Sequence, residues 1–355
     1  MIKISRLSIL FFIAGSLVIQ GFCISSVNIA AGTTYQLLFD EKISHGHLLE
    51  QVELGPRIPG SNVSSEAQSL IMQALEPDWT VTFQNFTPQT SWNVFNIEIV
   101  NIVAERRADP SLDWIILGAH YDTRRLADRD PDPVNRTMPV PGANDGASGV
   151  AILLELARNI ISHNLMGIRL VFFDAEDQGR LDGWPWIVGS SYYVSQLSNP
   201  ATIRAAIIID MVGDSDLNIY KEKNSFQANS DLVNSIWDIA GNLGYEEAFL
   251  DSEKYSILDD HTPFLEKNIP AVDIIDFEYP SWHTVADTID KTSAHSLGVV
   301  GQTLESWLLQ DLELPPTTSS KGAYFSIIGI LSGMMVFAVA RRLRMHKMNS
   351  LQIPK

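Results

Sequence analysis

Five side chains of the kinds that bind metal ions occur at expected strand ends or in loops of the central part of the chain: His120, Asp145, Asp177, Asp210 and His283. Imidazoles and carboxylates are the ligands that a catalytic zinc ion needs when thiolates are absent, with one position left open for water or substrate. Glu176 directly precedes Asp177. If Asp177 binds a metal ion, Glu176 lies at the edge of the same site as a general acid or base. These residues therefore predict a metal-dependent catalytic site.

Each candidate also has an ordinary structural explanation. Asp145 could be the N-cap of a helix, and Asp210 could cap a turn. His120 could be a hydrogen-bonded imidazole in the core, and His283 could serve in packing or at the surface. The pair Glu176–Asp177 could be a solvated acidic loop. The segment 141–157 has glycines and an Asn-Asp-Gly turn before a helical apolar pattern, which is where an N-cap is expected. All five coincidences together are less expected than any one of them, which favours a shared site.

Short apolar runs that end in polar residues indicate the elements that position these side chains. The runs cover 114–117, 169–173, 205–209 and, interrupted by Asp273, 271–275; helical patterns cover 145–162, 230–243 and 293–311. Such alternation predicts an α/β fold, a three-layer sandwich with a mostly parallel, buried sheet and helices on both faces. Polar residues directly after the carboxyl ends of the strands are where these folds place their sites, and His120, Glu176, Asp177 and Asp210 have that position.

The first part of the chain is less regular. Residues 35–54 have some helical character, 55–61 form a Pro/Gly-rich turn, and 64–75 resemble a helix that Ser64 or Ser65 could cap. Residues 79–86 and 94–103 alternate as strands do. We expect these elements to complete the layers around the sheet.

Composition excludes several classes of function. The chain has 355 residues, 45% apolar content and a formal charge of −17 without a basic patch in its central region, so nucleic acid is not an expected partner. Its single cysteine, Cys23, follows the N-terminal apolar region, which excludes a disulfide framework, a cysteine-ligated zinc and a cysteine nucleophile in the mature domain. The Gly-x-Ser-x-Gly elbow of serine hydrolases and the phosphate-binding P-loop are both absent.

The two ends have the composition of targeting segments. Lys3 and Arg6 precede a short apolar run typical of a secretory signal, and an uncharged apolar stretch near the C-terminus has the length of a membrane span and is followed by basic residues. We therefore expect a catalytic domain on the extracytoplasmic side, anchored in the membrane by a C-terminal helix. The expected parts are a signal (1–31), a catalytic domain (32–313), a linker (314–322), a transmembrane helix (323–340) and a basic cytoplasmic tail (341–355).

With these residues in hand, the chain resembles the zinc metallopeptidase family that contains secreted aminopeptidases and glutaminyl-peptide cyclotransferases (glutaminyl cyclases). The resemblance covers roughly 45–312, and its ordered landmarks are GPRIPGS at 55–61, GAHYDT at 118–123, GANDGASGVA at 142–151, FFDAEDQG at 172–179, IIIDMVG at 207–213, DDHTPFLEKNIPAV at 259–272 and WHTVADTIDK at 282–291. It implies an α/β sandwich around a central mixed, mainly parallel sheet.

The resemblance implies two different uses of the same residues. As in the family's aminopeptidases, two zinc ions would share Asp145, with Asp177, Asp210, His120 and His283 completing the sites and Glu176 activating a bridging water. As in the glutaminyl cyclases, one zinc ion would be held by Asp145, Asp177 and His283. His120 and Asp210 would then not be ligands, and Asp210 would join a hydrogen-bond network.

Three features of the chain favour the cyclase. The first is Asp259, which in cyclases shares a hydrogen bond with the general acid/base. The second is the pair of tryptophans, Trp282 before the ligand histidine and Trp184 near the place of a pocket tryptophan. The third is the segment from GPRIPGS at 55–61 through MQALEPDWTV at 72–81 to FQNFTPQT at 83–90, which resembles the N-terminal region of the cyclases. The loop NDGASGVA, the absence of the cyclase cysteine pair (Ala119 on one side) and Asp177 in place of a second Glu point the other way.

The function expected from this balance is a cyclotransferase that converts the N-terminal glutamine of peptides or proteins to pyroglutamate and releases ammonia. The alternatives are a di-zinc aminopeptidase of the same family and, more remotely, an inactive receptor-like ectodomain. Glu176 and Asp259 would be the catalytic residues, and Trp184 and Trp282 would bind the substrate.

Overall fold

The structure, a computed structural model, describes residues 26–28, 34–107, 112–160 and 167–311. The chain divides into two compact units, 1–314 and 315–355, and every described residue belongs to the first. The expected linker, transmembrane helix and basic tail lie outside the described residues, as does all of the expected signal except residues 26–28. Within the described ranges, no helix combines the length and the apolarity that a membrane crossing requires.

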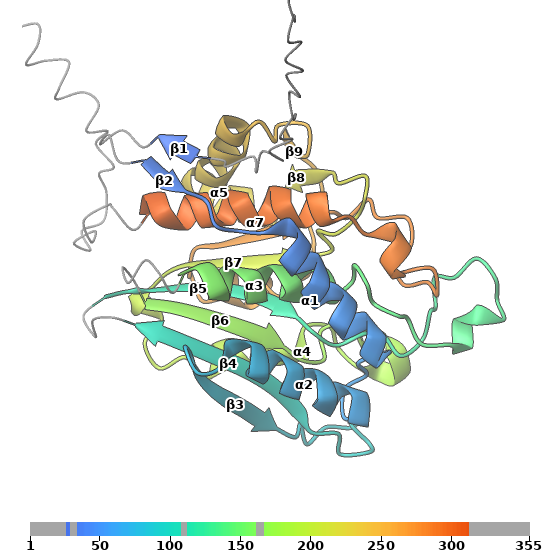
Figure 1. Cartoon of the computed structure of the whole chain (residues 1–355). Coiled ribbons are helices and arrows are strands. Elements are labelled where there is room, and N and C mark those ends of the chain that lie inside the picture. The colour runs from blue at the N-terminus through green and yellow to red at the C-terminus, as the bar shows by residue number, and fades with distance from the viewer. Residues whose placement is uncertain (1–25, 29–33, 108–111, 161–166, 312–355) are drawn as a thin grey trace, which may run out of the picture. The chain divides into compact units, whose positions relative to one another are not determined.

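A six-stranded mixed sheet forms the centre of this unit (Figure 1). Its strands, from one edge to the other, are β10 (Ala271–Ile275), β7 (Ile203–Asp210), β5 (Trp114–His120), β6 (Gly167–Phe173), β4 (Ile99–Arg107) and β3 (Thr80–Phe86). The first four strands are parallel to one another, whereas β4 runs antiparallel to both of its neighbours. The predicted α/β fold with a mixed sheet is confirmed.

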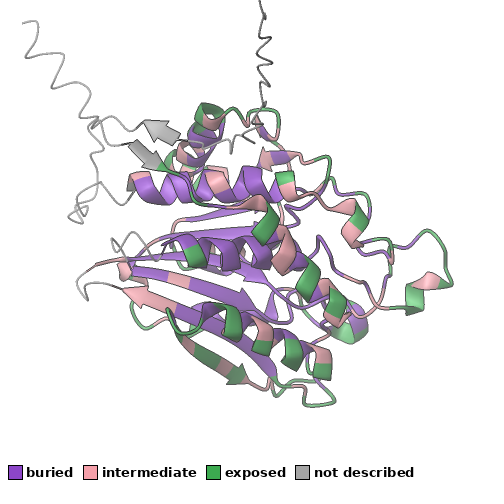
Figure 2. Cartoon of the chain, in the orientation of Figure 1, coloured by how far each residue is buried: buried purple, intermediate pink, exposed green. Residues whose placement is uncertain are grey.

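Helices cover both faces of the sheet, which explains why its central strands are largely apolar. The larger core lies on the face covered by α1 (Glu41–Leu54), α2 (Asn62–Leu75), α3 (Ala147–Ile160), α5 (Lys223–Leu243) and α7 (Ala294–Asp311). On the opposite face, Tyr193 of α4 (Val188–Ser195) and Phe264 of α6 (Thr262–Glu266) pack against Ile116 and Ile208. Figure 2 shows the central strands of the sheet, α3 and α7 as largely buried, whereas the edge strand β3 and the outer sides of α1 and α2 are exposed.

Small elements complete the described chain. Two short sheets pair β1 (Ser26–Asn28) with β2 (Thr34–Gln36) antiparallel and β8 (Ile219–Lys221) with β9 (Phe249–Glu253) parallel. Short 3₁₀ turns occur at Asn135–Thr137, Leu181–Gly183, Pro200–Thr202 and Ile289–Lys291.

Helix α3 packs unusually close to the sheet because it carries a glycine on the contact side. A Cβ atom on Gly149 would lie 2.2 Å from the carbonyl oxygen of Ile209 and 2.9 Å from Cβ of Ala119. The glycine therefore lets the first turn of α3 lie directly against the ends of β5 and β7. This contact places the loop before α3 beside the carboxyl ends of the central strands.

Helix α7 holds the segment that directly precedes α1. The Glu305 carboxylate in α7 accepts hydrogen bonds from the backbone N–H groups of Leu38 (3.0 Å) and Phe39 (2.9 Å), just before α1. A Cβ atom on Gly301 would lie 2.1 Å from the Phe39 ring, so the ring packs directly on the α7 backbone. The segment before α1 is thus held by a helix more than 250 residues later in the chain.

Several predicted boundaries are wrong. The N-cap of α2 is Ser61, not Ser64 or Ser65, since its hydroxyl accepts the Ser64 N–H at 3.1 Å. Helix α5 begins at Lys223 rather than at 230, with Glu222 as its cap and a kink at Asn229. Strand β4 begins at Ile99 rather than at 94, and residues 37–40 form a strand-to-helix connection outside α1.

Candidate metal centre and active site

The five predicted metal-binding residues converge at the carboxyl edge of the sheet. His120 and Asp210 end β5 and β7, and the loops before α3, after β6 and after β10 supply the others. The parallel register makes this possible, since it pairs His120 with Phe173 and Asp210 with Ile275. None of the five side chains is more than 7% exposed as a residue: His120, Asp145, Asp177, Asp210 and His283.

These side chains form two triads that share one carboxylate. In the first triad, His283 Nε2 lies 2.8 Å from Asp177 Oδ1 and 3.6 Å from Asp145 Oδ2. In the second, His120 Nε2 lies 3.2 Å from Asp145 Oδ1 and 3.1 Å from Asp210 Oδ1. Within each triad the candidate ligand atoms all lie within 4.8 Å of one another. The geometry therefore offers one metal position beside His283 and a second beside His120.

The donor atoms of the first triad fit a divalent cation. Asp145 Oδ2 and both carboxylate oxygens of Asp177 are buried and accept no hydrogen bond from the described residues. Burying carboxylate oxygens that accept no hydrogen bond is costly, and a metal ion bound beside them would lower that cost. The donors are only imidazole nitrogen and carboxylate oxygen, which suits zinc at a catalytic site.

Asp122 fixes the loop that carries Glu176 and Asp177. Its carboxylate accepts the backbone N–H groups of Glu176 (2.9 Å) and Asp177 (3.3 Å) and the side-chain amide of Gln178 (3.0 Å). Its Oδ1 also lies 3.5 Å from His120 Nδ1, so one buried carboxylate orients both a candidate ligand and the catalytic loop. Outer groups of this kind set the direction of metal ligands.

Asp287 does the same for the loop before α3. It accepts the backbone N–H groups of Asn144 (2.9 Å) and Asp145 (3.2 Å) and the hydroxyl of Tyr279 (2.8 Å). Burial and the charge of Asp145 raise the pKa of Asp287 to about 7, although these hydrogen bonds oppose the shift. The Asp145 side chain faces His120 and His283 and not the first amides of α3, so its position is that of a ligand and not of a simple cap.

An aromatic wall surrounds His283. Its ring stacks on Trp186 with a centroid distance of 5.9 Å and an interplanar angle of 16°, and lies 3.9 Å from Trp282. The Arg124 guanidinium lies 4.9 Å from the Trp186 ring and donates to the Asp177 carbonyl at 2.8 Å. These contacts fix the orientation of the His283 imidazole relative to the indoles of Trp186 and Trp282.

The predicted substrate-binding role of Trp184 does not agree with its position. Trp184 does not line the cavity; it is 7% exposed and packs with Ile99 and Val188, at a ring distance of 4.8 Å from Trp92. The indole that lines the cavity is Trp186, two residues later. A Cβ atom on Gly179 would fall 1.9 Å from the Trp186 ring, so this glycine makes the room for it.

A cavity of about 250 Å³ opens onto the triads. Its floor is formed by carboxylates, its walls include Trp186, Trp282 and Phe277, and two arginines, Arg129 and Arg180, line it as well. The carboxylates that line it are Asp145, Glu176, Asp177, Asp210 and Asp259. Glu176, Asp259 and Trp282 thus line the same cavity as the candidate ligands.

Burial and crowding of like charges govern protonation in this cavity. Burial raises the pKa of Glu176 well above its ordinary value, and Asp177, Asp259 and Asp260 add to the effect while His120 opposes it. Burial likewise raises the pKa of Asp177 to about 6 and that of Asp210 to about 7. A glutamate whose pKa is raised above its ordinary value is suited to general acid/base work.

In the second triad, the pKa values of His120 and Asp145 shift in opposite directions. Burial disfavours the charged form of His120, but Asp210, Asp122 and Asp145 outweigh it and raise the pKa of His120 well above its ordinary value. Burial would also raise the pKa of Asp145, yet the hydrogen bond and charge of His120 hold it below its ordinary value. Asp145 is therefore ionised and ready to bind a cation.

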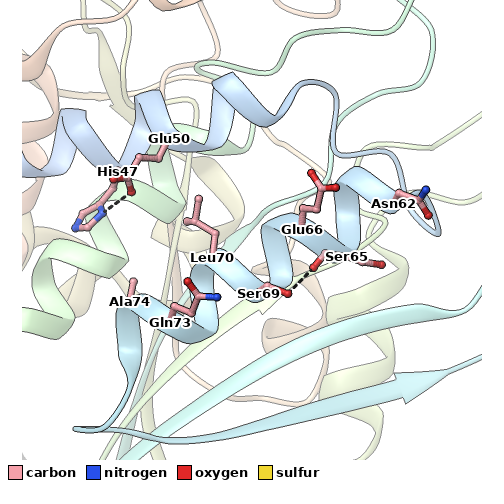
Figure 3. A pocket seen from close by; sticks show the side chains of 9 residues that line it. All are labelled: His47, Glu50, Asn62, Ser65, Glu66, Ser69, Leu70, Gln73 and Ala74. Carbon is pink, nitrogen blue, oxygen red and sulfur yellow. Dashed lines mark hydrogen bonds and ion pairs between the residues drawn. The ribbon is translucent and has the colours of Figure 1, made fainter.

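A second, larger hollow of about 790 Å³ lies between α1 and α2 (Figure 3). Its lining holds none of the candidate ligands, and the hydroxyl of Ser69 is occupied by the Ser65 carbonyl at 3.0 Å. His47 only approaches Glu50 one turn later, at 3.6 Å. The described lining of this hollow brings no such set of ligand atoms together, so the cavity at the strand ends is the candidate site.

Four supporting residues were not identified from the sequence alone: Asp122, Arg124, Trp186 and Asp287. Three of them lie in or directly after the quoted landmarks, GAHYDT at 118–123 and WHTVADTIDK at 282–291. A polar residue that continues a strand-end motif is the signal that could have found them, whereas nothing local distinguishes Trp186 from Trp184.

Comparison with known proteins agrees with this geometry. Residues 101–308 match the model of peptidase family M28. Among solved structures, glutaminyl cyclase of Porphyromonas gingivalis is 31% identical with a TM-score of 0.72 and covers 77% of this chain and 99% of its own. A leucine aminopeptidase precursor from Bacteroides thetaiotaomicron is 31% identical with a TM-score of 0.72, covering 77% and 97%. A Zn-dependent exopeptidase from Parabacteroides distasonis is 30% identical with a TM-score of 0.70, covering 76% and 97%.

The chain belongs to peptidase family M28. It is an enzyme of the kind represented by these neighbours, which carry both cyclase and aminopeptidase activities in their names. Zinc is the metal that the donor set and the neighbours support.

Proposed function

We propose that the protein is a zinc-dependent glutaminyl-peptide cyclotransferase that converts an N-terminal glutamine to pyroglutamate and releases ammonia. The observation that carries the proposal is the pairing of Glu176 with a further carboxylate, Asp259, in a cavity walled by Trp186 and Trp282. The charge of Asp259 contributes to the raised pKa of Glu176. Both reactions need a group that accepts and returns a proton, but a hydrolase must admit water as the nucleophile, whereas a cyclase must exclude water so that the substrate amine attacks.

Asp145, Asp177 and His283 would hold the zinc ion. When bound there, zinc supplies a Lewis acid that polarises the γ-carbonyl of the substrate glutamine. Asp287 and Asp122 hold the backbone on which Asp145 and Asp177 stand, and thereby set the direction of both carboxylates. In this proposal His120 and Asp210 orient Asp145 through their shared hydrogen-bond network.

Glu176 moves the proton in the proposed reaction. Its carboxylate takes a proton from the substrate α-amine while the amine nitrogen forms a bond to the γ-carboxamide carbon. The protonated Glu176 then delivers that proton to the amide nitrogen, the carbon–nitrogen bond breaks, and ammonia leaves. Atoms balance, since a peptide with N-terminal glutamine gives a pyroglutamyl peptide and ammonia. The raised pKa of Glu176 suits both transfers near neutral pH.

The aromatic wall decides the outcome of the reaction. If water replaced the α-amine as nucleophile, the product would be N-terminal glutamate. Trp186, Trp282 and Phe277 line the cavity and would exclude water around the reacting carbon. Orienting the amine over the carboxamide contributes in the same direction, because a well-placed intramolecular nucleophile has a large advantage over solvent.

A di-zinc aminopeptidase is the second candidate, and one observation favours it. His120 and Asp210, together with the shared Asp145, form a second set of ligand atoms close enough to bind a second ion. In that case Glu176 would activate a water molecule instead of moving the amine proton. An inactive receptor-like ectodomain is disfavoured, since a fold without chemistry has no need for this many buried carboxylates in one cavity.

Zinc content and product mass, measured on the same sample of full-length protein, distinguish the candidates. The cyclase predicts one zinc ion per chain and a Gln-initiated peptide that loses the mass of ammonia. Two zinc ions and a peptide shortened by one residue would replace the proposal with an aminopeptidase. A peptide with an acetylated N-terminal glutamine is the matched control, because it has no free amine to cyclise.

We also propose that the catalytic domain lies on the extracytoplasmic side and is anchored by residues 323–340. The apolar stretch and the basic residues after it support this topology. Protease treatment of intact cells should cleave the catalytic domain but not the C-terminal tail, and the reverse pattern would contradict the proposal.

A further inference from the structure

Two arginines in the wall of the catalytic cavity have no carboxylate partner among the described residues. Arg129 and Arg180 both line the cavity and both are exposed. Their neighbours in the chain are already paired: Arg124 binds Asp128 at 2.6 Å, and Arg125 lies 2.8 Å from Asp182. In a chain of net charge −17, two unpaired guanidinium groups beside one cavity need an explanation.

The backbone of each arginine is held close to a tryptophan of the cavity wall, through His283 for Arg129 and through Gly179 for Arg180. The Arg129 guanidinium lies 5.2 Å from the Trp282 ring centroid, and its backbone N–H donates to the His283 carbonyl at 3.2 Å. The backbone N–H of Arg180 donates to the Trp184 carbonyl at 2.7 Å, and Arg180 follows the glycine on which Trp186 packs. Each guanidinium therefore starts from a backbone position that is fixed relative to an indole of the wall.

The charge of the cavity changes between its floor and these side chains. Carboxylates that are at most 7% exposed form the floor, whereas Arg129 and Arg180 are exposed to solvent. A peptide entering with its N-terminus first places its amine near the carboxylates. Each following residue lies about 3.3–3.6 Å further out in an extended chain, so the second and third residues reach the solvent-exposed part of the cavity.

We propose that Arg129 and Arg180 form a subsite for a carboxylate of the substrate, carried by an acidic side chain at the second or third position. The substrate class is then peptides in which aspartate or glutamate closely follows the N-terminal residue. Arginine suits this role because its planar fork matches a carboxylate in two hydrogen bonds. The identity of the first residue as glutamine rests on the proposed function, but the carboxylate subsite does not.

The test compares the kcat/KM of the full-length, zinc-loaded protein for matched peptides. The peptides begin with glutamine, have glutamate, glutamine or lysine at the second or the third position, and have amidated C-termini. We expect glutamate to exceed glutamine and glutamine to exceed lysine. Replacing either arginine with glutamine should lower kcat/KM for the glutamate peptides by roughly three- to fivefold, the range of exposed ion pairs, and leave the glutamine peptides nearly unchanged.

Charge reversal and a matched arginine sharpen the test. The double variant Arg129→Glu/Arg180→Glu should favour lysine peptides over glutamate peptides, and added salt should weaken both preferences. Arg125→Gln is the control, since Arg125 is paired with Asp182 and does not line the cavity. It should keep the wild-type order of the peptides.

The outcomes separate this inference from the proposed function. Equal kcat/KM for all peptides, or the same loss in Arg125→Gln, overturns the subsite. A preference that appears only when the C-terminus is free overturns the assignment to a side chain and moves it to the terminal carboxylate. If the peptides are shortened instead of cyclised, the proposed function fails, but the order of their release rates still tests the arginines. If none is turned over, calorimetric affinities for Glu176→Gln test the same order.

Discussion

Replacing Gly149 with alanine tests whether the close contact between α3 and the sheet builds the metal centre. The added Cβ would lie 2.2 Å from the Ile209 carbonyl oxygen, whereas ordinary contact begins at 3.4 Å. The obstacle is backbone, which cannot rotate away, so the first turn of α3 must retreat by about 1.2 Å. Asp145 stands just before that turn and would retreat from His120, its neighbour at 3.2 Å.

Two opposing effects set the size of the change. Alanine favours the helix over glycine by about 1 kcal/mol, whereas overpacking costs about 1–3 kcal/mol. Because the clash is with backbone, we expect the upper end and a net loss of about 2 kcal/mol, which lowers Tm by about 4–8 °C. Moving a group that supports a metal ligand costs about 10–100-fold in metal affinity, and we expect zinc affinity to fall by that amount.

Gly46→Ala is the matched control. Gly46 lies inside α1, and no atom would lie within 4 Å of an added Cβ. The same substitution should therefore raise Tm by about 2–4 °C through helix propensity alone and leave zinc affinity unchanged. Thermal unfolding and zinc competition titrations measure both variants. Wild-type Tm and zinc affinity in Gly149→Ala would refute the claim that this contact positions Asp145.

Three further predictions concern the chemistry. Glu176→Gln should lower kcat by about 10²–10⁴-fold with zinc content and Tm kept, and full activity would assign the proton transfer to another group. Trp186→Ala should reduce kcat/KM at nearly constant Tm, whereas Trp184→Ala should cost about 3–5 kcal/mol of stability; matching effects in kinetics and melting would contradict this division. Because burial raises the pKa of the proposed ligand Asp177 to about 6, protons compete with the metal for its carboxylate as the pH approaches and falls below this value. Zinc affinity should therefore weaken as pH falls from about 8 to about 5, and a constant affinity in competition titrations would disprove the argument.

The strand ends could be predicted from the sequence because burial on both faces leaves a clear pattern. The apolar runs that end at His120 and Asp210 indicate buried strands and are not expected in a solvated loop. In α/β sheets the residues at the carboxyl ends of such strands lie close together. The gathering of His120, Asp177 and Asp210 follows from that rule and from parallel pairing, whereas Asp145 and His283 come from loops at the same edge. The proximity of residues far apart in the sequence was therefore predictable where burial in the core produced the apolar pattern.

Local details were not predictable, for reasons that differ between sites. Val94 and Phe95 alternate as strand residues do but are 68% and 81% exposed, so their pattern did not report burial. Trp184 and Trp186 are two residues apart, but only the Trp186 indole packs on Gly179, and Ile187 directly after it has a left-handed backbone conformation (φ +54°). Neither feature has a signal in the residues around the tryptophans. The cap of α2 was misplaced because Ser61, Ser64 and Ser65 are all suitable caps.

The grip of α7 on the segment before α1 has a consequence for biosynthesis. During synthesis, Leu38 and Phe39 are made long before Glu305, which accepts their backbone hydrogen bonds. In the same way Asp177 is made before His283, its imidazole partner. Domains fold as units during synthesis, and contacts between distant parts of the chain form late. A chain interrupted before residue 283 would have carboxylates without their imidazole partner. The candidate metal centre can therefore be completed only after residue 283 has been made, near the end of the synthesis of the catalytic domain.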